Sequence, residues 1–159
     1  MAGTPVHQGH LNAEGKRFAL VASRYNEVVT SRLIQGAEDC LLRHGASAQD
    51  VEVFRTPGSF EIPLVARKVA ASGKFHAVIC LGAIIRGDTP HFDFVASEAA
   101  RGVGRAATDT GVPVIFGIVT TDTVEQAIDR AGGRSGNRGA DAALAAIEMA
   151  NLLEKLGHA

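Results

Sequence analysis

The sequence is poor in the residues that mark redox, metal or disulfide chemistry. It has two cysteines, no tryptophan and one tyrosine among 159 residues. Cys40 and Cys80 both fall in apolar patterns, which predicts two core residues and neither a disulfide nor a metal pair. The six histidines show neither an HExxH motif nor a zinc-type spacing with cysteine. We therefore expect no metal and no cofactor.

The sequence also lacks a charge excess and a long apolar run. Sixteen Lys and Arg residues balance 17 Asp and Glu residues, for a net charge of −1, and no basic block stands out. Nucleic acid and membrane surfaces are therefore not expected as partners. The apolar runs are too short to span a bilayer, and the first residues lack the pattern of a signal peptide. These absences predict a cytoplasmic location.

What the sequence has is a regular alternation of short apolar runs with helical patterns. The four runs suit strands buried on both faces and cover residues 17–22, 51–55, 77–82 and 113–119. A helical pattern follows each run, and a long one closes the chain over about residues 137–156. Such alternation with right-handed crossovers predicts a flavodoxin-like three-layer α/β/α sandwich. Its four-stranded parallel sheet has the expected order 2-1-3-4, with helices on both faces.

The length fits one domain over residues 17–159, preceded by an aperiodic N-terminal arm over residues 1–16. The fourth helix is expected to be short. Asp122 and Glu125 match the D-x-x-E pattern of a capping box, and Gly132 with Gly133 is expected to end the helix.

Ligands of open parallel sheets bind beyond the carboxyl ends of the strands. Two segments there leave a structural and a functional interpretation open. Tyr25, in SRYN, is either a core aromatic or a stacking platform for a flat ligand. The segment TPGSFE, residues 56–61, favours a turn with a helix cap, although Ser59, Glu61 and helix N–H groups could also hold hydroxyls or an anion.

The segment RGDTPH, residues 86–91, combines a glycine, a hydroxyl and a histidine before a helix. Its N–H groups suit a phosphate, whereas the carboxylate of Asp88 would repel one. His91 is either a solvated residue of the first helical turn or a proton donor and acceptor beside an anion site.

The segment AGGRSGNRG, residues 131–139, carries Arg134 and Arg138 and follows Arg130. It lacks the GxxxxGK[ST] pattern of a P-loop, so it is either a solvated connection or a source of guanidinium groups for a phosphate. These residues indicate a metal-free enzyme or binding protein for a small, flat, phosphorylated or polyhydroxylated ligand. They leave the reaction open.

Five long blocks in this order resemble the lumazine synthase (6,7-dimethyl-8-ribityllumazine synthase) family. They are RYNEVVTSRLIQGAEDCLLRHG, PGSFEIP, LGAIIRGDTPHFDFV, PVIFGIVTTDTVEQAIDRAG and GNRGADAALAAIEMANL. The resemblance covers the chain from Arg17 to about Leu153. It implies riboflavin biosynthesis and a transferase. The implied reaction condenses 5-amino-6-(D-ribitylamino)pyrimidine-2,4-dione with 3,4-dihydroxy-2-butanone 4-phosphate to 6,7-dimethyl-8-ribityllumazine, phosphate and water.

The resemblance also assigns site residues. His91 is the implied acid/base residue, and Arg130 helps to bind and expel phosphate. The implied substrate-binding residues are Tyr25, Asn26, Gly58, Ser59, Phe60, Glu61, Ala83, Ile84, Ile85, Gly87, Asp88, Thr89, Phe116, Arg130 and Arg138. Two of them depart from the family pattern, since Ala83 replaces a frequent Thr and Arg138 a usual Lys. An arginine keeps the charge but not the tunable pKa of lysine, which argues against proton transfer at position 138.

The expected topology places the site between subunits. The loops after the first three strands cluster, whereas Phe116, Arg130 and Arg138 belong to the far side of the sheet. The resemblance implies a pentameric ring, with the arm packing on a neighbouring subunit. The short turn at 132–139 favours members that form a sixty-subunit icosahedral shell, whereas Pro5 weakens strand pairing by the arm. Riboflavin synthase is a candidate partner.

Two other functions compete with the synthase. One is a related riboflavin synthase of the same fold, which the phosphate-loop residues and Arg130 argue against. The other is a non-catalytic shell or flavin-binding protein, which the presence of both His91 and Arg130 argues against.

Overall fold

A computed structural model describes residues 3–157 of the chain, so residues 1–2 of the expected arm and 158–159 of the expected domain lie outside it. The elements are β1 (Phe18–Ser23), α1 (Glu27–Arg43), β2 (Val51–Thr56), α2 (Ile62–Ala71), β3 (Ala77–Ile85), α3 (His91–Thr110), β4 (Val114–Thr121), α4 (Val124–Asp129), β5 (Ala131–Gly133), β6 (Gly136–Asn137) and α5 (Arg138–Gly157), with short 3-10 turns at Ala48–Asp50 and Ser59–Glu61. The main sheet has the order β2-β1-β3-β4, and all its pairings are parallel. The predicted flavodoxin-like sandwich is confirmed.

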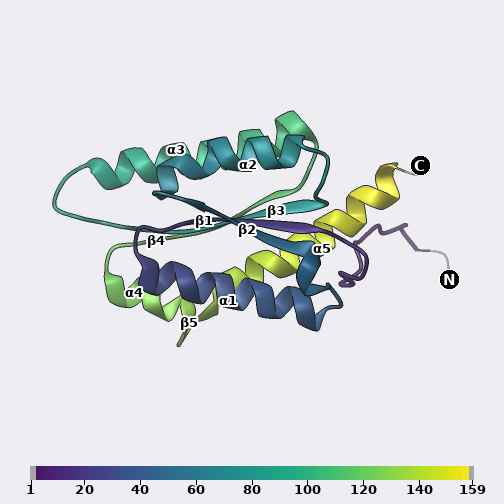
Figure 1. Ribbon diagram of the computed structural model, residues 1–159, viewed down its shortest axis with the longest axis horizontal. Coiled ribbons are helices and arrows are strands. Elements are labelled where there is room, and N and C mark those ends of the chain that lie inside the picture. The colour runs from purple at the N-terminus through teal and green to yellow at the C-terminus, as the bar shows by residue number, and fades with distance from the viewer. Residues whose placement is uncertain (1–2, 158–159) are drawn as a thin grey trace.

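Helices cover both faces of this sheet (Figure 1). The helices α2 and α3 lie on one face, and α1, α4 and α5 lie on the other. Strand residues alternate between two hydrophobic clusters, because successive side chains of a strand point to opposite faces. Leu20 and Ile79 pack towards α1 and α5, whereas Val21 and Val78 pack towards α2 and α3. No helix within residues 3–157 is long and apolar enough to cross a lipid bilayer.

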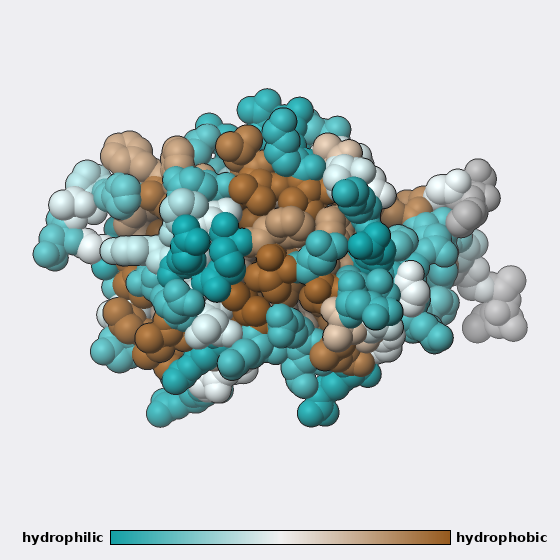
Figure 2. All heavy atoms as spheres, viewed as in Figure 1, coloured by the Kyte–Doolittle hydropathy of each residue, from teal (hydrophilic) through white to brown (hydrophobic). Residues whose placement is uncertain are grey.

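The edge strand β2 is less buried than its sequence predicts. β1 is buried throughout and β3 nearly so, but most of β2 is half-buried or exposed, and Val53 is 39% exposed. The expectation of two buried faces is therefore wrong for β2, because an edge strand has a neighbour on one side only. Hydrophobic side chains also gather in the middle of the face shown in Figure 2, between the two helix layers.

The segment after β4 differs from its prediction in two ways. The cap of α4 is Thr123, whose hydroxyl accepts from the backbone N–H of Gln126 at 3.1 Å, so the expected cap by Asp122 is wrong by one position. The helix also ends at Asp129, before the two glycines. Residues 131–137 instead form the antiparallel β5–β6 hairpin, where the glycine-rich sequence predicts a turn.

The described part of the N-terminal arm lies along α5 of its own chain. Asn151 Nδ2 donates to the carbonyls of His10 and Asn12 at 2.6 and 3.0 Å, and Lys155 Nζ donates to the carbonyl of Gln8 at 2.7 Å. Gly9 fits closely against α5, where an added Cβ would stand 1.8 Å from the Glu148 carbonyl oxygen. Packing of the arm on a neighbouring subunit stays a prediction.

Candidate active site

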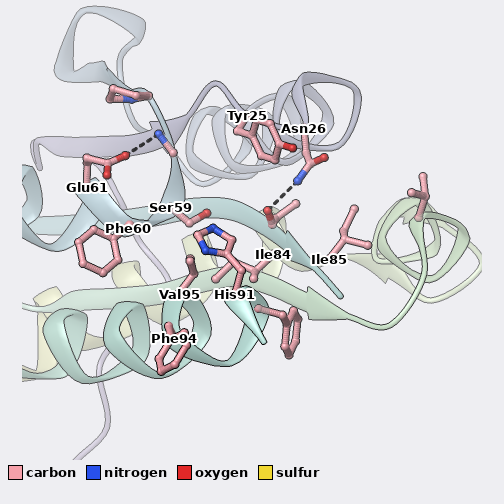
Figure 3. A pocket seen from close by; sticks show the side chains of 15 residues that line it. Tyr25, Asn26, Ser59, Phe60, Glu61, Ile84, Ile85, His91, Phe94 and Val95 are labelled. Carbon is pink, nitrogen blue, oxygen red and sulfur yellow. Dashed lines mark hydrogen bonds between the residues drawn. The ribbon is translucent and has the colours of Figure 1, made fainter. Parts of the chain in front are cut away.

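A cavity of about 720 Å³ opens at the carboxyl ends of β1 and β3, within the size range of small-molecule sites. This is the switch point of the sheet, because β2 and β4 lie on opposite sides of that strand pair. Of the predicted site residues, the cavity brings together Tyr25, Asn26, Gly58, Ser59, Phe60, Glu61, Ala83, Ile84, Ile85 and His91. Figure 3 shows most of them around one hollow. Segments far apart in the sequence thus meet here as predicted.

Asn26 fixes the first wall of the cavity through its backbone. It caps α1 in the left-handed conformation, with φ 64° and ψ 50°, which asparagine tolerates better than most residues. Its Nδ2 donates to the carbonyl of Ala83 at 3.0 Å, so its side chain ties the turn after β1 to β3 (Figure 3). Tyr25 beside it is 73% exposed, which excludes the core interpretation of this aromatic.

The turn after β2 supplies a second wall. The backbone N–H of Gly58 donates to Glu61 Oε1 at 2.9 Å, which holds the turn closed. Ser59 is 6% exposed, and its hydroxyl has no hydrogen-bond partner among residues 3–157. Ser59 lines the cavity, but its hydroxyl oxygen is itself buried beside the Gly82 backbone, where a hydroxyl without a partner is costly. The turn therefore has the structural role that its sequence favours, and its role in holding a ligand stays a prediction.

His91 begins α3 and is exposed in the cavity. In Figure 3 its ring lies between Ser59 and Ile84. Val95 lies one helical turn after His91 and also lines the cavity. Further lining residues that sequence reasoning missed are Pro57, Phe92, Phe94, Val95 and Val124. The helical spacing of Phe94 and Val95 from His91 could have identified these two.

Gly87, Asp88 and Thr89 form an exposed loop between β3 and α3 but do not line the cavity. An added Cβ on Gly87 would meet nothing within 4 Å, and its φ is not positive. Within residues 3–157, therefore, neither packing nor backbone strain requires glycine at this position. The predicted close approach of this loop to a ligand stays a prediction.

Phe116, Arg130 and Arg138 are exposed and do not line the cavity either. Phe116 lies on the edge strand β4. The backbone N–H of Arg138 donates to the carbonyl of Arg130 at 2.7 Å, so the two arginines are neighbours at the base of the β5–β6 hairpin. Neither has an ion pair within the part of the chain that the structure describes. The backbones of these two arginines therefore meet away from the residues that line the chain's own cavity.

The two cysteine thiols are buried and do not line the cavity. Burial raises the pKa of the Cys80 thiol to about 12, and burial together with Asp39 and Asp141 raises that of Cys40. Neither thiol is activated as a nucleophile. Among residues 3–157, no three His, Cys, Asp or Glu side chains are grouped in a way that could hold a metal ion.

Fold and cavity together define an α/β protein with a cavity of small-molecule size at the switch point of a parallel sheet. A model of the 6,7-dimethyl-8-ribityllumazine synthase family matches residues 15–154, and the chain belongs to this family. The resemblance found in the sequence is thereby confirmed. Membership connects the chain with riboflavin biosynthesis and with lumazine synthase activity of the transferase type.

Among solved structures, the chain is similar to a de novo designed Rossmann fold protein at 17% identity. The match covers 70% of this chain and 90% of the designed protein, with a TM-score of 0.40.

Proposed function

We propose that this chain is a working synthase. It condenses 5-amino-6-(D-ribitylamino)pyrimidine-2,4-dione with 3,4-dihydroxy-2-butanone 4-phosphate, and it releases 6,7-dimethyl-8-ribityllumazine, phosphate and water. The observation that carries the proposal is the cavity itself, which brings an exposed tyrosine, an unpartnered buried hydroxyl and a histidine together in a member of this family.

The pyrimidine fits the wall formed by Tyr25 and the end of β3. The ring of Tyr25 is free to stack on a flat heterocycle, and the backbone of Ala83, Ile84 and Ile85 offers polar groups to its edge. Asn26 and the turn that carries Ser59 are proposed to hold the hydroxyls of the ribityl chain. Asn26 keeps its oxygen for this purpose, because its Nδ2 is already engaged by Ala83.

The chemistry consists mainly of proton transfers around a nucleophile that the substrate brings. The 5-amino group attacks the ketone, and one water leaves to give an imine. Elimination of phosphate, with a proton shift, leaves a carbonyl on the neighbouring carbon. The ribityl-bearing nitrogen attacks this carbonyl, and loss of a second water completes the ring. His91 is the residue in the cavity whose imidazole can give and take protons. Holding two reactants in line lowers a barrier by up to about 7–11 kcal/mol, so positioning carries much of the catalysis.

The phosphate half of the site is proposed to come from two chains. Gly87, Asp88 and Thr89 belong to the loop beside the cavity, whereas Arg130 and Arg138 pair at a hairpin whose residues do not line that cavity. A neighbouring subunit would bring its Phe116 and both arginines to this cavity. The pentameric ring, a sixty-subunit shell, cytoplasmic location and contact with riboflavin synthase belong to the same proposal.

Incubation of the pure protein with both substrates tests the function. We expect lumazine fluorescence and free phosphate to appear together, in equal amounts and faster than in buffer. Turnover no faster than in buffer would contradict the proposal. Conversion of lumazine alone into riboflavin would identify the related riboflavin synthase activity instead.

A further inference from the structure

Arg86 follows β3 directly and contacts three segments around the cavity. Its backbone N–H donates to the carbonyl of Thr121 at 2.9 Å and so extends the β3–β4 ladder. Its Nε donates to Asp122 Oδ1 at 2.9 Å, and its Nη1 lies 3.6 Å from Asp93 Oδ1. Its Cζ lies 4.4 Å from the centre of the Phe92 ring. One side chain therefore joins the end of β3, the first turn of α3 and the turn before α4.

Each of these three segments also lines the cavity. Ile85 precedes Arg86, His91 and Phe92 begin α3, and Val124 begins α4. The contacts of Arg86 thus fix the places from which these side chains enter the cavity.

The charge of Arg86 is already neutralised within the chain. Two carboxylates, Asp93 and Asp122, lie within ion-pair distance of its guanidinium group. A phosphate at this position would have to compete with both, and the two carboxylates would repel it. The contacts therefore indicate a structural link rather than a phosphate ligand.

We expect the loss of the Arg86 contacts to affect the turnover rate more than the free energy of unfolding. The side chains of Arg86, Asp93 and Asp122 are 48%, 64% and 68% exposed, and exposed ion pairs add little to folding. The arrangement needs the planar fork of arginine, because one group donates to Asp122, lies within ion-pair distance of Asp93 and lies over the Phe92 ring. A lysine keeps the charge but cannot make all three contacts together.

We propose that Arg86 is a positioning residue, which sets the place of His91 through the first turn of α3 and links that turn to the start of α4. The proposal rests on the proposed function for its kinetic effects, but the link itself does not depend on it.

The test compares R86Q, R86K and D122N with the unaltered chain. R67Q is the matched control, since Arg67 forms an exposed ion pair with Asp109 at 3.0 Å at the other end of α3. We expect R86Q to lower kcat by about 10- to 100-fold, because small misplacements of reacting groups have effects of that size. R86K should lose less activity and D122N should also lower kcat, whereas R67Q should leave it within about twofold.

Phosphate binding distinguishes the link from direct contact. If Arg86 held the phosphate, D122N would free its charge and lower the KM for the butanone phosphate, and R86Q would mainly raise that KM. Either result would overturn the proposal. Unchanged kcat in R86Q would also overturn it.

Hydrogen exchange of the backbone over residues 86–95 gives a readout without substrates. We expect faster exchange there in R86Q and D122N but not in R67Q, with similar melting temperatures for all. If the unaltered chain shows no turnover, the proposed function fails, while faster exchange in R86Q still supports the link. Unchanged exchange overturns the link whatever the activity.

Discussion

His91, Asn26 and Ser59 illustrate what single residues reveal before a structure is known. Their residue types and positions after strands sufficed to predict that they meet, because the carboxyl ends of parallel strands share one sheet edge. Their contacts were not predictable. The bond from Asn26 to Ala83, and the lack of a partner for the Ser59 hydroxyl in the described part of the chain, depend on side-chain packing across segments that are distant in sequence.

Gly82 is a buried residue of β3 whose small size the surrounding side chains require. A Cβ at this position would stand 2.6 Å from Ser59 Oγ and 3.1 Å from Ser23 Oγ. We expect G82A to lower the free energy of unfolding by about 1–3 kcal/mol, because overfilled cores lose stability in this range. Urea unfolding followed by circular dichroism measures the loss.

The double variant G82A/S59A is the control for that explanation. Removing the Ser59 hydroxyl removes the closest clash, so the losses of the two single variants should not add. Additive losses would contradict a direct contact between the two positions.

Cys80 gives a chemical test of the buried sheet. Its pKa of about 12 leaves only about one thiol in ten thousand ionised at pH 8, and the thiolate is the reactive form. We expect a C40S variant to react with a thiol reagent at pH 8 only after unfolding in guanidinium. If the folded C40S variant reacts as fast as a fully exposed thiol, β3 is not buried as described.

The helices and strands divide into those that periodicity predicts and those that it does not. β1, β3, α1, α3 and α5 were predictable, because long or fully apolar patterns dominate their sequences. The exposure of β2 was not, since an edge strand with apolar residues reads like a central one. The β5–β6 hairpin has only five residues between its first and last pairing positions, too few for a period to show.

The first turn of α4 is a testable case of local capping. Thr123 accepts from Gln126 N, and Gln126 Oε1 accepts from the backbone N–H groups of Asp122 and Thr123. We expect T123A to lower the free energy of unfolding by about 1 kcal/mol, because loss of a cap costs about 0.5–2 kcal/mol. T123S keeps the hydroxyl and should have nearly the same free energy of unfolding as the unaltered chain. Equal losses in T123A and T123S would exclude the hydroxyl as the cause.

The whole chain separates a cavity from a cationic hairpin. His91 lies in the cavity, while Arg130 and Arg138 meet through a backbone hydrogen bond at the base of the β5–β6 hairpin. Both halves are expected to serve one reaction, so the proposed function needs two copies of the chain. Sequence order together with strand order was enough to predict this division. It could not predict which surfaces of the chains meet.

Mixed assemblies of two impaired variants test whether a site is shared. H91A should slow turnover by about 100-fold or more through loss of an acid/base group. R130A should mainly raise the KM for the butanone phosphate, since its guanidinium is suited to phosphate. If His91 and Arg130 of one site come from different chains, co-expression of both variants should produce sites with both residues intact. With random assembly, about one quarter of the sites should be of this kind.

The measured quantity is kcat/KM at low butanone phosphate, where each variant alone is slow. Recovery to about one quarter of normal activity in the mixture indicates a shared site, because only neighbouring chains can restore the pair. The double variant H91A/R130A, co-expressed with the unaltered chain, is the matched control for assembly. In that mixture, half of the His91 residues and half of the Arg130 residues are intact. About one quarter of the sites should then be intact if two chains share each site, but about one half if each chain carries a whole site. If the mixture shows only the mean of the activities of H91A and R130A, His91 and Arg130 act within one chain.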